Sequence, residues 1–239
     1  LELFREHAGA EYSVAWIDCS AGGDRLGRSV LRLGEHSGYG ELESTARRGP
    51  AVPCDMPACL LNRYSLGAFN SLYYALAGDG GASRRVALEP YFFPLDGIRH
   101  WNRLYGRGGF IQYQCVLPEQ AGEAGLGEML KRISATGLGS FLAVLKAFGP
   151  GNDNYLSFPM AGYTLALDFK RSPGLDELLR ELDRIVVDCG GRLYLAKDAR
   201  MPEAVFKQTY PDWESFVQVR ARYGADRVFH SLQSRRLGI

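Results

Sequence analysis

The sequence predicts an α+β domain, a mostly antiparallel sheet with helices packed on one side of it. Three observations support this fold class. Short segments in which apolar and polar residues alternate, as in half-buried strands, occur in both halves of the chain. Two longer segments carry apolar residues at helical spacing. From residue 110 to residue 196 these segments follow the order β-α-β-β-α-β, which is that of a split-βαβ or ferredoxin-like unit.

The first half of the chain predicts a helix, two strands, a loop and a second helix. Residues 1–9 look like the last turns of a helix, and alternation predicts strands over 12–17 and 29–33. Residues 34–58 are rich in Gly, Pro, Ser and charged residues, which predicts a long loop. Residues 60–77 carry apolar residues at positions that predict a helix.

Together, residues 34–83 are expected to form a mobile insertion. The helix within it has two interpretations. It contacts a membrane surface, so that a lipid-linked substrate can be reached, or it packs on the core beside a mobile loop. Residues 84–90, which follow, predict a short strand.

The second half gives a firmer pattern. Alternation predicts strands over 110–118, 140–148 and 163–169, and helical spacing predicts a helix around 126–133. Residues 192–196 predict a last short strand.

Two further helical regions lie in this half. Ser172 and Pro173 are the residue types that open a helix, as N-cap and first-turn residue, and the apolar stripe of this helix covers 175–186. The glycines at 190–191 are expected to end it. Residues 202–229 predict two short amphipathic helices.

Composition and charge narrow the function classes. The chain has 239 residues, of which 46% are hydrophobic and 23% charged, so it can bury a sizeable core. Its 28 Lys and Arg nearly cancel 27 Asp and Glu, and the formal net charge is +1. No broad electrostatic field attracts nucleic acid, so we expect no nucleic-acid partner.

The five cysteines are an odd number without CxxC spacing, and we expect them to be small buried residues in a reduced, cytoplasmic protein without a metal site. No apolar run approaches the length of a membrane span, and no signal peptide is recognisable. The sequence opens without Met, partway through a helical pattern. We therefore expect it to continue a longer polypeptide.

Common catalytic and nucleotide-binding motifs are missing from the sequence. It contains no GxGxxG, GxxxxGK[ST], HExxH or GxSxG. By itself the chain is therefore not expected to hold a nucleotide phosphate.

Polar residues on the predicted strands are the remaining candidates for a site. Gln112 and Gln114 are two residues apart and point to one face, while Lys146 ends the strand segment 141–145 and Lys197 ends the strand 192–196. Two interpretations remain open. These side chains converge over one surface of the sheet, or the lysines extend to water and Lys197 forms a surface pair with Asp198.

Several long phrases also carry a family resemblance. The phrases "SFLAVLKAFGPGNDNYLSFPMAGYTLALDFK", "GGRLYLAKDARMPEAVFKQTYPDWESF" and "FFPLDGIRHWNRLYG" occur in this chain. They resemble the C-terminal part of FAD-linked oxidoreductases of the vanillyl-alcohol oxidase type, nearest to the decaprenylphosphoryl-β-D-ribose oxidase group. The resemblance covers nearly the whole chain apart from residues 34–83.

This resemblance implies that FAD and substrate are bound by two different domains. In that family an N-terminal domain binds FAD, and a C-terminal domain lays a sheet over the flavin to form the substrate pocket. Residues 1–239 are therefore expected to be the substrate-binding domain, and the domain that holds most of the FAD is expected outside this chain.

The resemblance also implies roles for single residues. It implies that Lys197 and Lys146 are the catalytic lysines of the pocket, with Lys197 also contacting the cofactor, beside the flavin and the substrate. It implies that Tyr194, in the same phrase, contacts the cofactor. The implied substrate-binding residues are Gln112, Gln114, Trp16, Phe92, Thr164 and Ala166. The last three depart from the residue types that the family pattern favours, which puts the substrate in doubt.

The resulting prediction is an FAD-dependent enzyme that oxidises an alcohol group of a sugar or polyol, with the substrate carried on a lipid phosphate as one option. The predicted partners are this small molecule and the chain's own N-terminal FAD domain. The predicted location is cytoplasmic, with a peripheral position at the inner membrane face as an option. The alternative is a ligand- or protein-binding module that has lost catalysis.

Overall fold

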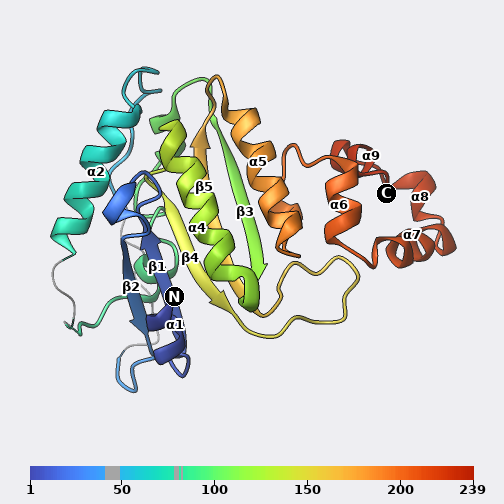
Figure 1. Ribbon diagram of the computed structural model, residues 1–239, viewed down its shortest axis with the longest axis horizontal. Coiled ribbons are helices and arrows are strands. Elements are labelled where there is room, and N and C mark those ends of the chain that lie inside the picture. The colour runs from blue at the N-terminus through green and yellow to red at the C-terminus, as the bar shows by residue number, and fades with distance from the viewer. Residues whose placement is uncertain (41–48, 78–80, 82) are drawn as a thin grey trace.

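The structure is a computed structural model that describes residues 1–40, 49–77, 81 and 83–239. Across these residues six strands form one antiparallel sheet in the order β2-β1-β4-β5-β3-β6 (Figure 1). The strands are β1 (Tyr12–Ile17), β2 (Ser29–Gly34), β3 (Phe110–Pro118), β4 (Ala143–Phe148), β5 (Gly162–Lys170) and β6 (Arg192–Leu193). The predicted α+β class with an antiparallel sheet is confirmed.

Helices connect and flank these strands. The α-helices are α1 (Glu2–Glu6), α2 (Arg63–Leu76), α3 (Leu88–Phe92), α4 (Glu119–Thr136), α5 (Leu175–Asp188), α6 (Glu203–Thr209), α7 (Trp213–Arg222), α8 (Ala225–Val228) and α9 (Leu232–Leu237). Three short 3-10 helices are η1 (Gly23–Arg25), η2 (Trp101–Tyr105) and η3 (Leu195–Lys197).

The predicted ferredoxin-like unit runs from β3 to β6. Its chain order is β3-α4-β4-β5-α5-β6, and its strands lie side by side in the order β4-β5-β3-β6. β1 pairs with the free edge of β4, with Ala15 opposite Leu145, and β2 extends the sheet by one more strand. The unit and its two added strands therefore share one continuous sheet.

The hydrophobic core lies between the sheet and helices α4 and α5, which cover one face (Figure 1). Alternate residues of each strand point into it, and on β5 these include Leu165, Leu167 and Phe169, each at most 1% exposed. The matching helix stripe includes Leu179 and Leu182 of α5, both fully buried. Each such side chain contributes roughly 1.5–3 kcal/mol by leaving water, so this face of the sheet is fixed by the core.

α2 lies against the opposite face, at the β1 end of the sheet. Tyr73 of α2 packs on Trp16 of β1 with ring centroids 4.6 Å apart, and Asn70 donates a hydrogen bond of 2.8 Å to the buried carboxylate of Asp18. Leu72 and Leu76 on the outer side are exposed. The predicted helix is confirmed. Of the predicted mobile insertion, residues 41–48, 78–80 and 82 lie outside the described residues.

Two local predictions were wrong. Residues 84–90 form no strand, and helix α3 begins at Leu88 instead, with Pro90 in its first turn, where the missing N–H group costs no intrahelical bond. Helix α5 is capped by Gly174, in the left-handed conformation with φ 81°, and not by Ser172. The Ser172 hydroxyl donates to the carbonyl of Lys170 instead, at 3.3 Å.

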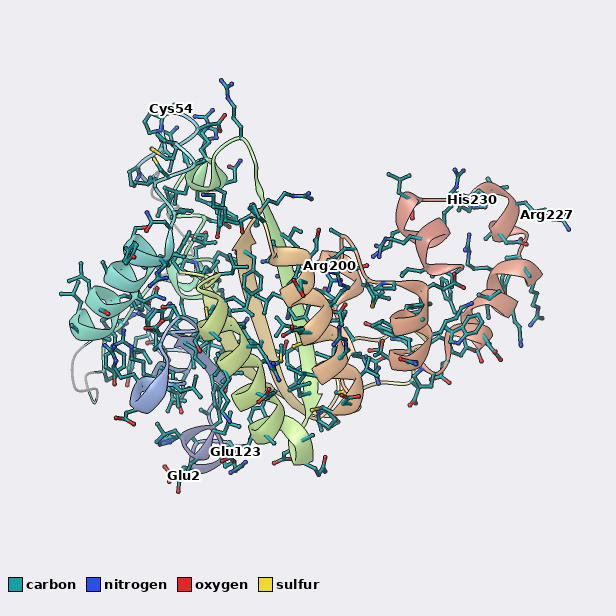
Figure 2. All side chains as sticks on the ribbon, turned by 45° about the horizontal axis from the view of Figure 1, so that its top comes forward. Glu2, Cys54, Glu123, Arg200, Arg227 and His230 are labelled. Carbon is teal, nitrogen blue, oxygen red and sulfur yellow. The ribbon has the colours of Figure 1, made fainter. Side chains whose placement is uncertain are left out.

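The cysteines and the C-terminal segment differ in part from expectation. Cys19 and Cys115 are buried as predicted, but Cys54 (Figure 2) and Cys59 are exposed. Within residues 202–229, where two short helices were predicted, the chain forms three, α6 to α8, and α9 follows them. None of the described helices combines the length and apolar character that a membrane span requires.

Candidate functional site

The face of the sheet opposite α4 and α5, called the open face below, carries most of the polar residues predicted for a site. In antiparallel pairing, residues opposite each other point to the same face. The register places Trp16 opposite Val144, Val144 opposite Ala166, and Ala166 opposite Gln114. Lys146 lies opposite Thr164, and Gln112 opposite Asp168.

Gln114 is held in place from within the sheet. Its Nε2 donates a hydrogen bond of 3.1 Å to the Thr164 hydroxyl, which in turn donates at 2.8 Å to the backbone carbonyl of Cys115. Thr164 is 1% exposed, so this chain of hydrogen bonds is shielded from water. The orientation of the Gln114 amide is therefore set by β5.

Asp168 is the residue that sequence reasoning missed. It is 2% exposed, and in the described part of the chain neither carboxylate oxygen has a hydrogen-bond partner of good geometry. Burial raises the pKa of Asp168 to about 6, although the Gln112 amide and the positive charge of Lys197 partly oppose the shift. Strand alternation could have identified it as a candidate, because it puts Asp168 on the same face as Thr164 and Ala166.

Lys197 occupies a turn and not the end of a strand. β6 has only two residues, and after it the chain turns into η3, where the Lys197 N–H donates to the Tyr194 carbonyl at 3.1 Å. The predicted strand over 192–196 was therefore too long. The hydrogen bonds between β6 and β3 end where the Tyr194 N–H donates to the Gln114 carbonyl, because the backbone N–H groups of Lys197 and Asp198 donate within the turn.

The charge of Lys197 is sensitive to its surroundings. Its side chain is half-buried, and this burial lowers the pKa of Lys197. The positive charge of Lys146 acts in the same direction, whereas the carboxylate of Asp168 opposes it. Three ionisable groups on one side of the sheet thus influence one another.

Lys146 itself lies inside β4, two residues before its end, whereas it was predicted to end the strand segment 141–145. The strand starts at Ala143, later than expected, and continues to Phe148. Lys146 is exposed on the open face. Both facts leave its ammonium group accessible from that side.

The predicted site residues are only partly brought together. One small hollow at the edge of β3 is lined by Gln112, Gln114, Tyr194 and Lys197. Trp16 is two strands away from β5, 8% exposed, and its indole N–H donates to the Phe141 carbonyl at 3.1 Å.

Phe92 lies elsewhere. Its ring packs edge-on against Tyr12 with centroids 4.9 Å apart, in a separate hollow lined also by His36 and Tyr91. Phe92 and Lys197 therefore do not line the same hollow. For a metal, the described residues offer no group of three or more His, Cys, Asp or Glu side chains.

Comparison with known proteins gives a clear relative. Over 235 residues the chain is 36% identical to decaprenylphosphoryl-β-D-ribose oxidase of Mycolicibacterium smegmatis, an alignment that covers 95% of the chain and 51% of that protein. The chain is a relative of this oxidase. It spans about half the length of the oxidase, and no family model matches it.

Two further relatives are more distant, and one of them has a named activity. An uncharacterised protein of Streptomyces coelicolor, from the mprA 5′ region, is 30% identical over 246 residues, covering 95% of the chain and 66% of that protein. An L-gulono-1,4-lactone dehydrogenase of Mycobacterium tuberculosis is 24% identical over 130 residues, covering 54% of the chain and 30% of that protein.

The match to decaprenylphosphoryl-β-D-ribose oxidase confirms the resemblance carried by the sequence phrases. Both relatives with a named activity are oxidoreductases, one an oxidase and one a dehydrogenase. The roles of Lys197, Lys146 and the glutamines remain predictions.

Proposed function

We propose that this chain is the substrate-binding domain of an FAD-dependent oxidoreductase that oxidises an alcohol group of a sugar or polyol. One observation carries the proposal. Gln112, Gln114 and Lys197 line one small hollow at the edge of β3, and Gln112 lies opposite the buried Asp168 in the sheet. The proposal is also supported by the two relatives named as an oxidase and a dehydrogenase of sugar-type compounds.

The residues present fit a flavin. A flavin is a flat ring system whose polar edge carries carbonyl oxygens and an N–H group, and it gains negative charge on reduction. Amide side chains such as Gln112 and Gln114 bind such an edge, and a positive Lys197 complements the added charge. The carboxylate of Asp168, whose oxygens are buried, acts through its charge, which favours the protonated form of Lys197.

In the proposed reaction, bound FAD supplies the acceptor for the hydride that leaves the carbinol carbon. The chain's own residues handle charge and orientation. As the hydride leaves, the carbinol hydroxyl gives up its proton to water. Lys197 Nζ donates a hydrogen bond to the carbinol oxygen and stabilises the negative charge that develops there, an effect that is stronger in a site shielded from bulk water. Burial lowers the pKa of Lys197, the charge of Asp168 opposes this shift and the charge of Lys146 adds to it.

The remaining residues orient the substrate. Gln112 and Gln114 donate to and accept from sugar hydroxyls, and Thr164 keeps the Gln114 amide in one orientation. The small side chain of Ala166 leaves room above the sheet, and Tyr194 lines the hollow with its ring against Phe158. Trp16 and Phe92 would contact only a substrate large enough to extend along the open face.

The proposed partner is an FAD-binding domain of the same protein, which would close the open face. In more detail, we propose that the substrate is carried on a lipid phosphate. We also propose that the enzyme is cytoplasmic and lies at the inner membrane face. The name of the oxidase from Mycolicibacterium smegmatis, which contains a decaprenylphosphoryl sugar, motivates it.

The test uses the full-length protein that contains this chain. The purified protein is expected to show flavin absorbance that bleaches when D-ribose, D-xylose, xylitol or a polyprenylphosphoryl pentose is added under anaerobic conditions. Lys197→Ala is expected to slow the bleaching by about 10²–10³-fold. The matched control is Lys131→Ala, which removes an exposed lysine from α4.

Two results would contradict the proposal. Equal bleaching rates in Lys197→Ala and Lys131→Ala would remove the assignment of Lys197. A colourless full-length protein that binds a sugar without any redox change would favour the binding module.

A further inference from the structure

The turn that carries Lys197 has little regular structure of its own. β6 provides two residues before it, and η3 contributes three. Within the turn, backbone hydrogen bonds join Lys197 to Tyr194 at 3.1 Å and Asp198 to Leu195 at 3.3 Å. So short a segment needs contacts from elsewhere to fix the direction of a lysine side chain.

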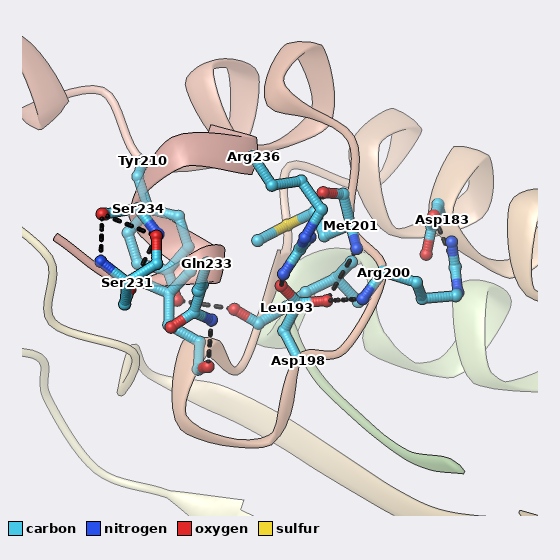
Figure 3. Close-up of polar contacts among 11 residues, drawn as sticks. Asp183, Leu193, Asp198, Arg200, Met201, Tyr210, Ser231, Gln233, Ser234 and Arg236 are labelled. Atoms are coloured by element: carbon cyan, nitrogen blue, oxygen red, sulfur yellow. Dashed lines mark hydrogen bonds and ion pairs between the residues drawn. The ribbon is translucent and has the colours of Figure 1, made fainter. Parts of the chain in front are cut away.

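Those contacts come from α9, near the C-terminal residue Ile239. Gln233 Nε2 donates a hydrogen bond of 2.6 Å to the Leu195 carbonyl, two residues before Lys197. Arg236 Nη2 lies 2.7 Å from Asp198 Oδ2, one residue after Lys197 (Figure 3). Gln233 and Arg236 are three residues apart on one side of the helix. They therefore hold the turn on both sides of the lysine.

Asp198 is the centre of the second contact. Its Oδ1 accepts hydrogen bonds from the backbone N–H groups of Arg200, at 2.9 Å, and Met201, at 2.7 Å. Its side chain is only 5% exposed, and Arg236 also donates to the Met201 carbonyl. Without Arg236 the carboxylate would be left buried and uncompensated, so the turn around it would rearrange.

The ends of this arrangement are themselves anchored. Ser231 and Ser234 form a capping box that starts α9, and Leu237 at its end is 1% exposed in the core. On the other side, Arg200 donates to Asp183 at 2.6 Å and to the Leu179 carbonyl of α5, where it lies beside the helix (Figure 2). The turn is thus fixed between α5 and α9.

We propose that Gln233 and Arg236 are positioning residues for Lys197, so that the last turn of helix in the chain sets the reactivity of the site. The catalytic role of Lys197 in this inference rests on the proposed function. The effect of Gln233 and Arg236 on the position of Lys197 does not. Shifting a reacting group by about 1 Å can slow a reaction by about 10²-fold. Loss of the α9 contacts moves the lysine ammonium in the same way.

The experiment measures Lys197 in the full-length protein in two ways. The first is the rate and pH dependence of its acetylation by acetic anhydride, followed by mass spectrometry. The second is the rate of flavin bleaching by the most active compound of the panel above. Arg236→Ala is expected to change the acetylation profile of Lys197 and to slow bleaching by about tenfold or more.

Arg235→Ala is the matched control, because Arg235 is the exposed neighbour on the same helix. It is expected to leave both readouts unchanged. Arg236→Lys, which keeps the charge but loses the forked donor, is expected to restore only part of the wild-type behaviour. Gln233→Met removes one neutral donor at similar size, and it carries the test if circular dichroism shows that Arg236→Ala does not fold.

The outcomes separate this inference from the proposed function. If Lys197 is acetylated in Arg236→Ala and Gln233→Met as it is in Arg235→Ala, the positioning role is overturned, whatever the enzyme does. If the acetylation profile changes but Lys197→Ala bleaches normally, the positioning role holds and the proposed catalytic role of Lys197 fails.

Discussion

Gln112 of β3 and Asp168 of β5 lie directly opposite each other in the sheet, with both side chains on the open face. The amide favours the charged carboxylate, yet burial still raises the pKa of Asp168 to about 6. A carboxylic acid that titrates near neutral pH, beside a half-buried lysine, is a feature that often marks functional sites. The pair therefore links the fold of the sheet to its proposed chemistry.

Replacing Asp168 with Asn is expected to stabilise the protein at neutral pH. The pKa of Asp in an unfolded chain is about 4, whereas that of folded Asp168 is about 6, so the folded state binds this proton more tightly. The free energy of unfolding therefore falls as pH rises from about 4 to 6. At about 1.4 kcal/mol per pKa unit, Asn should raise the free energy of unfolding at pH 7 by roughly 2–3 kcal/mol. Urea denaturation of both proteins at pH 7 measures this difference in the free energy of unfolding.

Asp153→Asn, in an exposed loop, is the matched control for this substitution. The difference between the two variants should vanish below about pH 3, where Asp168 is protonated in both the folded and the unfolded state. A wild-type pH dependence in Asp168→Asn would show that the carboxylate is already satisfied.

The apparent pKa of Lys197 should move in opposite directions in two variants. Lys146→Met removes a positive charge that lowers the pKa of Lys197, so the pKa should rise. Asp168→Asn removes a negative charge that raises it, so the pKa should fall. Competitive acetylation of Lys197 across a pH series measures both. Shifts of the same sign would mean that these groups do not act on Lys197 through their charges.

Two glycines of α4 should respond in opposite ways to alanine. A Cβ at Gly125 would lie 2.7 Å from Leu117 Cδ1 and 2.8 Å from Cys189 Sγ, whereas at Gly127 it would meet nothing within 4 Å. Gly125→Ala is therefore expected to cost about 1–3 kcal/mol of stability through overpacking. Gly127→Ala should add about 0.5–1 kcal/mol by favouring the helix.

Thermal and chemical denaturation of the two variants measure the difference. If Gly125→Ala is as stable as Gly127→Ala, helix α4 does not approach β3 as closely as the structure shows. The pair is informative because both changes lie on one helix and add the same methyl group.

Parts of the site could be predicted because they depend on local periodicity. Residues two apart on a strand share a face, and this rule alone places Gln112 and Gln114 together. The long apolar strands and helices of the β3 to β6 unit were predicted for the same reason. Short segments such as 84–90 were not, because a few alternating residues do not distinguish a strand from a helix turn.

The sequence by itself determined the antiparallel α+β class, the β-α-β-β-α-β order from β3 to β6 and the relationship to an oxidase, because the periodicity of apolar residues and the long phrases are local properties of the chain. Only the tertiary structure decided that Asp168 is buried without a hydrogen bond of good geometry from the described residues, that Phe92 lies in a different hollow from Lys197, and that α9 holds the lysine's turn across 38 residues. Burial, pKa and pairing depend on which distant segments meet, and local spacing carries no information about that.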